Sequence, residues 1–307
     1  MQPSVAVLIP CFNESAAIGD VVRSFRGALP DARIYVFDNN STDGSAELAA
    51  KAGAVVRAEP RQGKGNVVRR MFADVEADVY VLVDGDGTYD ATAAPRLVSS
   101  LVQGGYDMVA AARQPAEADS YRPGHRFGNR ALTGIVARVF GKPITDLLSG
   151  YRVLSRRFVK SFPALSSGFE IETELTVHAL ELGIPFIELE TAYFARAGDS
   201  KSKLSTWQDG WRILRTIVKL VRGERPLAFF GAIAVAAAVP ALVIGVQLWL
   251  TFVETGLVPR FPSAILATGL MLTGFLSLVC GLVLETVTRG RQEMKRLAYL
   301  ALKPFER

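Results

Sequence analysis

The chain has 307 residues, enough for one large α/β domain and a second, smaller part. Half of its residues are hydrophobic, and they concentrate in the last third of the chain. The net charge of +5 favours an anionic membrane surface or phosphate-bearing ligands, and no nucleic-acid-binding motif accompanies it. The two cysteines, Cys11 and Cys280, exclude a disulfide framework and a zinc module and fit a cytoplasmic catalytic part.

Short apolar runs alternate with helical patterns through the first part of the chain. Strand-like runs lie at 5–9, 34–37, 55–56, 79–83 and 108–111, and helical patterns lie at 46–52 and 67–73. Ser15 is expected to cap a further helix that runs to about Leu29. This β-α-β-α alternation predicts a doubly wound, mostly parallel α/β sheet.

Polar side chains follow three of the expected strands. They are Asn13 and Glu14, Asp38 and Asp43, and Asp84 and Asp86. Because parallel strands end at the same edge of a sheet, we expect these groups to share one ligand-binding edge. Together they are typical of a nucleotide site.

The segment Asp84-Gly85-Asp86 follows the apolar, β-branched run at 79–83. Its two carboxylates repel one another unless a cation lies between them, and oxygen ligands suit Mg²⁺ or Mn²⁺. Such an ion can neutralise a diphosphate leaving group. The alternative is a solvated Asp-Gly turn without a ligand.

The turn Gly63-Lys64-Gly65 is the first expected source of positive charge at this edge. It could place a lysine and free backbone amides near phosphates. It lacks the spacing of a nucleotide-binding P-loop, and the alternative is a solvated turn lysine.

Four motifs in this order resemble family 2 glycosyltransferases of the GT-A fold. They are Val-Leu-Ile-Pro-Cys-Phe-Asn-Glu at 7–14, Asp38-Asn39-Asn40-Ser41-Thr42-Asp43-Gly44, Gly63-Lys64-Gly65-Asn66 and Asp84-Gly85-Asp86. The resemblance implies a nucleotide-sugar donor and a metal held by Asp86 and Asp84. It implies donor contacts from Pro10, Asn13, Glu14, Asp38, Asn40, Lys64 and Asp84. Many relatives carry a second acid where this chain has Asn39.

Later motifs resemble the polyprenyl-phosphate branch of that family, which includes dolichyl-phosphate mannose synthases. They are Asp146-Leu147-Leu148-Ser149-Gly150-Tyr151-Arg152, Phe169-Glu170-Ile171-Glu172, and Arg196 followed by Gly198-Asp199-Ser200-Lys201-Ser202-Lys203. The candidates for binding the acceptor phosphate are Arg122, Arg126, Arg130, Ser149, Arg196, Lys201 and Lys203. Arg130 and Arg152 join Asp84 and Asp86 as the expected catalytic residues.

The chemistry of a lipid phosphate explains the basic residues. Its second pKa is ~6, so the attacking oxygen is already largely ionised at neutral pH. The protein mainly has to bring two anions together, which arginine and lysine achieve. The alternatives are a solvated basic helix face and general attraction to anionic lipid. Glu170 and Glu172 are expected to face the core or to lie behind the site.

We place the catalytic region at 1–205. After it, the sequence becomes first basic and amphipathic and then strongly apolar. Residues 206–225 read as a basic amphipathic helix at a membrane surface, and 227–253 and 262–287 are each long enough to span a bilayer, which takes ~20 residues. Positive charges flank both spans and continue in a tail at 289–307. The bias predicts an inner-membrane protein with both termini and the catalytic domain in the cytoplasm.

We therefore expect an inverting glycosyltransferase that moves a sugar from a nucleotide donor to a polyprenyl phosphate. Two alternatives stay open: a processive polysaccharide synthase, and a non-catalytic membrane scaffold with a degenerate transferase domain. The sequence does not identify the sugar. It also does not distinguish UDP from GDP in the donor, or Mg²⁺ from Mn²⁺ as the metal. Membrane lipids are expected partners, and a homo-oligomer is left open.

Overall fold

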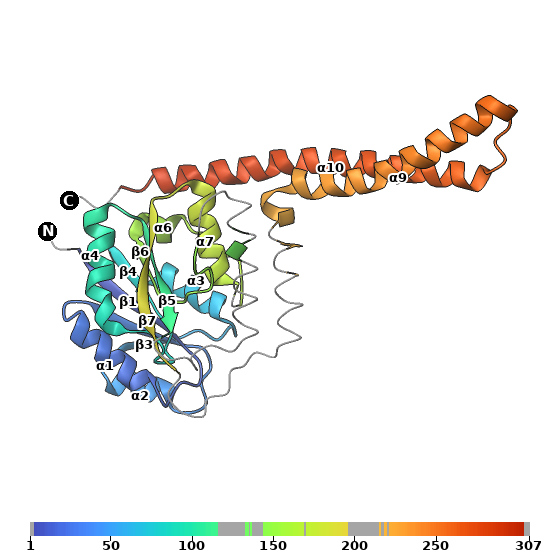
Figure 1. The fold of residues 1–307 in the computed structure, drawn as a ribbon. Coiled ribbons are helices and arrows are strands. Elements are labelled where there is room, and N and C mark those ends of the chain that lie inside the picture. The colour runs from blue at the N-terminus through green and yellow to red at the C-terminus, as the bar shows by residue number, and fades with distance from the viewer. Residues whose placement is uncertain are drawn as a thin grey trace. The chain divides into compact units, whose positions relative to one another are not determined.

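The computed structural model describes residues 3–115, 133–134, 136, 144–168, 170–195, 215, 218–219 and 221–303 (Figure 1). The chain divides into two compact units. The first is Met1–Ile213 together with Lys295–Arg307, and the second is Leu214–Met294. The first unit contains the α/β domain, and the second contains most of two long apolar helices.

A seven-stranded sheet forms the centre of the first unit. Its strands are β1 (Val5–Cys11), β2 (Arg33–Asp38), β3 (Val55–Ala58), β4 (Val79–Leu82), β5 (Met108–Pro115), β6 (Arg152–Ser155) and β7 (Phe186–Tyr193). They lie in the order β3-β2-β1-β4-β6-β5-β7. Strand β6 runs antiparallel to both neighbours, and the other pairs are parallel. The predicted mostly parallel α/β fold is confirmed.

Helices cover both faces of this sheet (Figure 1). They are α1 (Ile18–Ala28), α2 (Ser45–Lys51), α3 (Lys64–Asp74), η1 (Ala91–Ala93), α4 (Ala94–Gly104), α6 (Arg156–Ser161) and α7 (Ile171–Leu182). Buried residues of α1, α2 and α4 pack in one cluster, and those of α3, α6 and α7 pack in another. The sheet therefore separates two hydrophobic cores, as a doubly wound fold requires.

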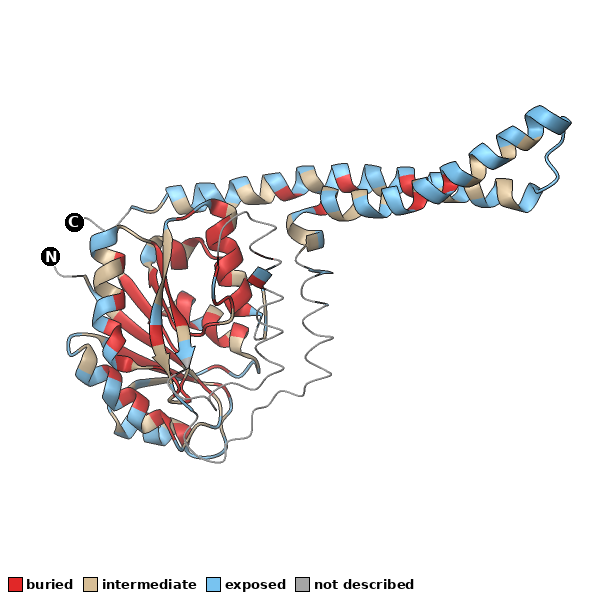
Figure 2. Cartoon of the chain, viewed as in Figure 1, coloured by how far each residue is buried: buried red, intermediate tan, exposed pale blue. Residues whose placement is uncertain are grey.

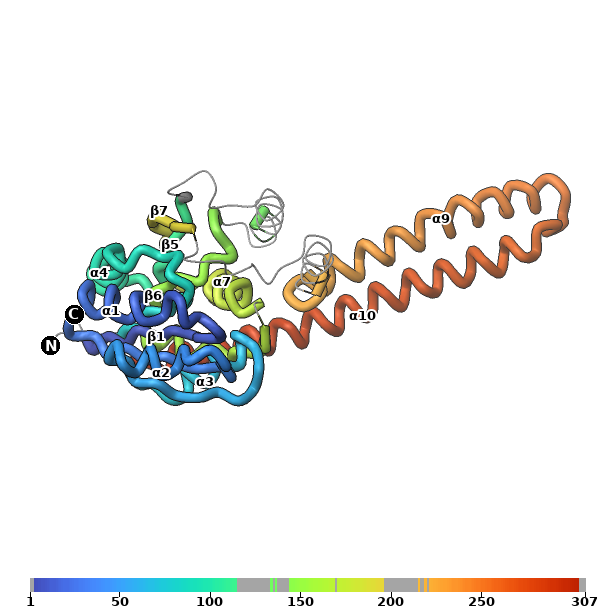
Figure 3. The backbone as a smooth tube through the Cα atoms, turned by 90° about the horizontal axis from the view of Figure 1, so that it is seen from below, coloured from blue at the N-terminus to red at the C-terminus, as the bar shows by residue number. Residues whose placement is uncertain are grey.

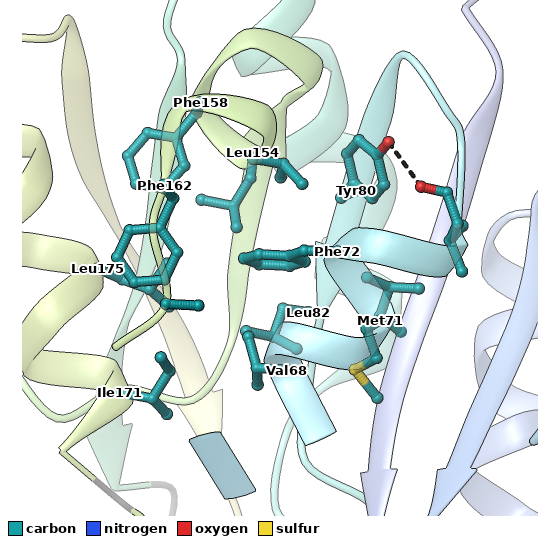
Figure 4. Close-up of a cluster of buried hydrophobic side chains, with 14 of the residues drawn as sticks. Val68, Met71, Phe72, Tyr80, Leu82, Leu154, Phe158, Phe162, Ile171 and Leu175 are labelled. Atoms are coloured by element: carbon teal, nitrogen blue, oxygen red, sulfur yellow. Dashed lines mark hydrogen bonds between the residues drawn. The ribbon is translucent and has the colours of Figure 1, made fainter. Parts of the chain in front are cut away.

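Strand β4 shows why its sequence is apolar without alternation. Tyr80 and Leu82 pack in the cluster with α3 and α6, whereas Val79 and Val81 pack in the cluster on the other face. Figure 4 shows Tyr80 and Leu82 beside Phe72, and the Tyr80 hydroxyl donates a hydrogen bond to the Val75 carbonyl at 3.1 Å. A strand buried on both faces gains from an apolar residue at every position.

The first helix begins later than the sequence predicts. Helix α1 starts at Ile18, and no side chain caps it. The predicted cap, Ser15, instead uses its backbone N–H to donate to Asp43 Oδ2 at 3.0 Å. The cap prediction is wrong because the loop after β1 is held by the neighbouring loop rather than by the helix.

The end of α10 (Phe261–Leu300) belongs to the first unit and is fixed to it by two buried acids. Tyr299 donates its hydroxyl to Asp107 Oδ2 at 2.6 Å, and Arg157 makes a two-pronged ion pair with the same carboxylate at 2.5 and 2.6 Å. Lys295 Nζ lies 2.7 Å from Glu181 Oε2, and the Glu181 side chain is fully buried. These contacts join the last turns of the chain to β5, α6 and α7.

The second unit is a pair of antiparallel helices, α9 (Pro226–Thr255) and most of α10 (Figure 3). Gly274 lies against Ala234 and Ala237, and Gly281 lies against Phe230, where an added Cβ would come within 3.1 Å of its nearest neighbour. Small residues thus allow the helices to approach closely. Most of their apolar side chains are exposed (Figure 2), and both helices are long and apolar enough to cross a membrane.

The two helices extend past the spans predicted at 227–253 and 262–287. Helix α9 begins at Pro226 and contains Pro240, and α10 continues through much of the expected tail at 289–307. The expected amphipathic helix at 206–225 falls mainly outside the described residues. Within it, Arg215, Val218 and Lys219 are helical and exposed.

We predict that Tyr299→Phe destabilises the full-length protein by about 1.5–3 kcal/mol, because Asp107 loses a hydrogen bond to a charged group. Thermal unfolding in detergent micelles measures this as a midpoint lowered by several degrees. Tyr106→Phe is the matched control, since the structure shows no side-chain hydrogen bond from Tyr106 to any described residue. Equal midpoints for wild type and Tyr299→Phe would contradict the prediction.

Candidate active site

The ends of β1, β2 and β4 bring three polar loops to one edge of the sheet. These strands are neighbours and run parallel, so their carboxyl ends coincide. The Asn39 N–H donates to the Cys11 carbonyl at 2.9 Å, and the Val83 N–H donates to the Leu8 carbonyl at 3.1 Å. The sequence prediction that these strand ends share an edge is therefore confirmed at the level of the fold.

The loops after β1 and β2 hold one another by side-chain hydrogen bonds. The Asn13 side chain accepts from the Thr42 N–H at 2.8 Å, and the Asn13 N–H donates to Ser41 Oγ at 2.9 Å. Asn13 adopts a left-handed backbone conformation with φ of 52°, which asparagine tolerates better than most residues. Asn13, which the sequence predicts to contact the nucleotide-sugar, thus also holds the two loops together.

Asp43 completes this junction as an ionised acid. Burial alone would raise its pKa, but hydrogen bonds from Ser45 and Ser15 outweigh that effect and lower the pKa of Asp43 to about 2. Ser45 Oγ donates to Asp43 Oδ1 at 2.5 Å and accepts from the Glu14 N–H at 2.9 Å. The carboxylate therefore organises the backbone next to Glu14 at all neutral and mildly acidic pH values.

Asp38 offers an acceptor at the end of β2. Its Oδ2 accepts from the Ser41 N–H at 3.1 Å. Its Oδ1 is buried and has no hydrogen-bond partner among the described residues. A buried carboxylate oxygen without a donor is suited to a ligand that brings one. The neighbouring Asn40 is exposed and donates to the Pro60 carbonyl at 2.9 Å.

Asn39 connects the loop after β2 to the loop before α3. Its amide donates to the carbonyls of Glu59 and Arg61 at 2.7 and 2.8 Å, and its oxygen accepts from the Gly63 N–H at 2.8 Å. A carboxylate could accept that last bond but could not donate the other two. This chain therefore uses both the donor and the acceptor of an amide at position 39.

The Asp84-Gly85-Asp86 turn is tightly packed from both sides. A Cβ on Gly85 would meet Ile9, Ile18 and the Pro10 carbonyl at 3.2–3.3 Å, and a Cβ on Gly150 would meet Asp84 Oδ2 at 2.3 Å. Asp86 is 6% exposed, and its Oδ1 accepts from the Thr88 hydroxyl at 2.6 Å. The glycines are thus needed for close approach, and the turn places both acids in fixed positions.

Lys64 is a buried cation that faces Asp84. Its ammonium forms ion pairs with Asp84, at 2.5 Å from Oδ1, and with Glu172 Oε1 of α7. Burial alone would lower the pKa of Lys64, but the charges of Asp84 and Glu172 outweigh burial and raise it, so the lysine stays protonated. The alternative of a solvated turn lysine is excluded, because the side chain is 10% exposed.

The glycines beside Lys64 do not present free amides. The Gly63 N–H donates to Asn39, and the Gly65 N–H donates to the Ser167 carbonyl at 3.1 Å. A Cβ on Gly65 would lie 2.2 Å from the Ser166 carbonyl oxygen. The prediction of free amides for phosphates is wrong for these two residues, which instead let the 166–167 backbone pack against α3.

The chemistry of Asp84 and Asp86 fits Mg²⁺ or Mn²⁺. Both are hard oxygen donors, and the Lys64 ammonium already acts as a cation on Asp84. Among the residues that the structure describes, no three histidine, cysteine, aspartate or glutamate side chains are grouped as metal ligands. A divalent ion here would need further ligands from water or from substrate phosphates, as Mg²⁺ commonly does.

Ser149 and Arg152 occupy buried positions in the first unit. Ser149 Oγ donates to the Ala111 carbonyl at 2.6 Å. Arg152 is 0% exposed and donates to the carbonyls of Ser149 and Leu147 and to the Thr176 hydroxyl, at 2.7–3.1 Å. The contact of Ser149 with an acceptor phosphate and the direct catalytic contact of Arg152, both expected from the sequence, do not agree with this placement. Both fix the conformation of the 146–152 loop.

The sequence reading missed the partner of that loop, Arg113. This arginine at the end of β5 makes a two-pronged ion pair with Asp146, at 2.6 and 2.7 Å. Glu188 of β7 accepts from the backbone and hydroxyl of Thr145 at 2.7 and 2.8 Å. The sequence feature that could have indicated Arg113 was a cationic side chain just after the strand predicted at 108–111.

The remaining predicted site residues divide into two groups. Pro10 and Glu14 lie at the end of β1 and in the loop after it, both half-buried, and the Glu14 carbonyl accepts from the Ala17 and Ile18 N–H groups. The basic candidates for the acceptor lie outside the described residues. They are Arg122, Arg126, Arg130, Arg196, Lys201 and Lys203.

Comparison with known proteins gives the family. The profile of glycosyl transferase family 2 matches residues 6–162. The chain is 32% identical over 304 residues to glycosyltransferase AglJ of Haloferax volcanii, covering 97% of this chain and 98% of the relative. It is 28% identical over 221 residues to a dolichyl-phosphate hexose transferase of the same organism, covering 72% and 95%. The chain belongs to glycosyl transferase family 2.

A solved structure has the same fold. The glucosyl-3-phosphoglycerate synthase of Mycobacterium tuberculosis, in complex with Mn²⁺, UDP and glucosyl-3-phosphoglycerate, superposes with a TM-score of 0.56. The sequences are 22% identical, and the match covers 71% of this chain and 79% of that one. The likeness confirms the GT-A-like architecture of the first unit.

We predict that Asn39→Asp lowers the free energy of unfolding by about 3 kcal/mol, because the Glu59 and Arg61 carbonyls, one in a buried and one in a partly buried hydrogen bond, lose their donor and face a carboxylate. Chemical denaturation of the purified protein measures this. Asn40→Asp is the control on the adjacent, exposed residue and should change stability by less than about 1 kcal/mol. Equal losses in both variants would show that Asn39 has no special structural role.

Proposed function

We propose that this protein transfers a sugar from a nucleotide-sugar to a polyprenyl phosphate at the cytoplasmic face of a membrane. The observation that carries the proposal is the combination of an acidic strand edge with a buried lysine and a pair of apolar helices on the same chain. The dolichyl-phosphate hexose transferase relative supports the lipid acceptor. The AglJ relative, a glycosyltransferase, supports sugar transfer, and its match extends over 97% of this chain, the apolar helices included.

The donor would bind at the ends of β1, β2 and β4. Asp38 Oδ1 is buried without a partner among the described residues and can accept from an N–H of the base or a hydroxyl of the ribose. Lys64 would provide positive charge near the diphosphate. Asp84 and Asp86 would hold a divalent ion, which when bound supplies charge that neutralises the diphosphate leaving group.

The acceptor requires little base catalysis. Its phosphate oxygen is already ionised and attacks the anomeric carbon of the sugar, while the bond from that carbon to the nucleoside diphosphate breaks. The diphosphate leaves with the electron pair, and the anomeric configuration inverts. Arg130 and the neighbouring basic residues would bind the lipid phosphate and offset its repulsion from the donor.

The proposed membrane topology rests on the distribution of positively charged residues around the two helices. Arg222 and Arg225 flank the start of α9, and Arg289 and Arg296 follow the apolar part of α10. Between the apolar parts, the charged residues are Glu254 in the last turn of α9 and Arg260 in the loop that follows. The positive-inside rule then places both ends of the helix pair in the cytoplasm, where nucleotide-sugars are made.

We predict that Asp86→Asn reduces transfer by roughly 100-fold or more, because a neutral amide binds Mg²⁺ or Mn²⁺ poorly. The side chain keeps its size and can still accept from Thr88, so the fold should survive. The assay measures transfer of labelled sugar to polyprenyl phosphate, and EDTA should abolish it in wild type. Unchanged turnover in Asp86→Asn would remove the metal assignment.

We predict that Arg130→Ala raises the KM for polyprenyl phosphate by about tenfold and leaves the KM for the nucleotide-sugar unchanged, because a charged phosphate contact is lost. Steady-state kinetics with each substrate varied in turn measures the two constants. Arg23→Ala, which removes a surface arginine paired with Asp20 on α1, is the control for loss of charge. Equal changes in both constants would point to a structural role for Arg130.

A further inference from the structure

Lys64 lies between two carboxylates and is shared by them. Its ammonium is 2.5 Å from Asp84 Oδ1 and also contacts Glu172 Oε1. The side chains of Lys64 and Glu172 are 10% and 8% exposed, so solvent and salt screen this pair weakly. Asp84 is the more accessible acid, at 28%. A ligand at the strand edge can therefore reach Asp84 while Glu172 stays behind Lys64.

Glu172 pairs through one oxygen only. Its Oε2 is buried and has no hydrogen-bond partner among the described residues. Burying a carboxylate with an unsatisfied oxygen destabilises a fold. Among the described residues, Lys64 is the basic group within ion-pair distance of Glu172, and the buried Arg152 interacts with it at longer range. The direct contact of Glu172 is therefore with Lys64.

We propose that Glu172 is a positioning residue that shares Lys64 with Asp84 and so keeps Asp84 available to a divalent cation. The inference rests on the proposed function, since it concerns the cation of the nucleotide-sugar. Without Glu172, Asp84 and Lys64 would form a closed pair, and Asp84 would have to lose this buried counter-charge before binding a metal. With Glu172 present, the ammonium can leave Asp84 and remain paired.

The same contact retains Lys64 at the site after Asp84 has changed partner. A lysine beside a divalent ion is repelled by it, and in a poorly screened site that repulsion is strong. Glu172 projects from α7 and Lys64 from the first turn of α3, so the pair also joins two helices that pack in the same core. Lys64 thus stays near the acids that face the donor.

The test is the affinity for Mn²⁺ alone, measured without donor or acceptor. Mn²⁺ is titrated into the full-length protein in detergent micelles, and the free ion is followed by electron paramagnetic resonance. Glu172→Gln, which keeps the size of the side chain, should weaken Mn²⁺ binding about tenfold, the order expected for interactions between contacting charged residues. The reason is that Lys64 is then held by Asp84 alone.

The double variant Lys64→Met with Glu172→Gln separates this mechanism from a direct effect of the Glu172 charge. Mn²⁺ affinity should return to the wild-type value or exceed it, because the competing ammonium is gone. Glu174→Gln is the matched control, since it removes a charge from the same helix at a residue that accepts from the Leu165 and Ser166 N–H groups. Its Mn²⁺ affinity should equal that of wild type.

Two kinetic constants provide a second measurement. Glu172→Gln should raise the KM for the nucleotide-sugar and leave the KM for the lipid phosphate unchanged, a split that a general loss of structure would not produce. If Glu172→Gln fails to fold, Glu172→Asp is used instead. It keeps the charge but retracts it by one methylene, and it should lie between wild type and Glu172→Gln in Mn²⁺ affinity.

Wild-type Mn²⁺ affinity in the variant at Glu172, or an equal loss in the double variant, would overturn the inference. The proposed function fails in a different way. If wild type binds Mn²⁺ and the variants respond as expected, but no sugar reaches a polyprenyl phosphate, then the positioning role stands and the assigned reaction is wrong. If wild type binds no Mn²⁺, the inference is overturned together with the metal assignment.

Discussion

The ion pairs of Lys64 with Asp84 and Glu172 are the interaction on which the rest of the site depends. Strand order brings the acids of several loops to one edge of the sheet, where their like charges repel and burial weakens solvation. One buried ammonium offsets that charge while leaving Asp84 partly exposed. The site can therefore fold without a ligand and still attract cations and substrates that carry them.

Hydrogen bonds among the loops keep this charge arrangement rigid. Asn39 holds the loop before α3, and Gly65 lets the backbone at 166–167 pack against the helix that carries Lys64. The buried Arg152 side chain donates hydrogen bonds to carbonyls of the 146–152 loop. Asn39, Gly65 and Arg152, which belong to the family motifs, thus hold the surrounding loops in place. Other motif residues face the edge of the sheet where substrates would bind.

The sheet, and the meeting of the polar strand ends at one edge, could be predicted from the sequence. The buried run before Asp84 and the β-α alternation depend on local pattern, and that pattern agrees with the observed fold. Partner choice was not predictable in the same way. The Glu172 contact with Lys64 joins residues far apart in sequence, and Ser15 and Arg152 take partners that only tertiary packing decides.

The most direct test of the account is transfer of label from a panel of UDP- and GDP-sugars, with Mn²⁺ or Mg²⁺, to undecaprenyl phosphate by the purified full-length protein. The account predicts label in a solvent-extractable lipid that is labile to mild acid and does not form when EDTA is present. Label in a polymer would contradict it in favour of a processive synthase. Folded protein that gives no labelled product from any donor would contradict it in favour of a non-catalytic scaffold.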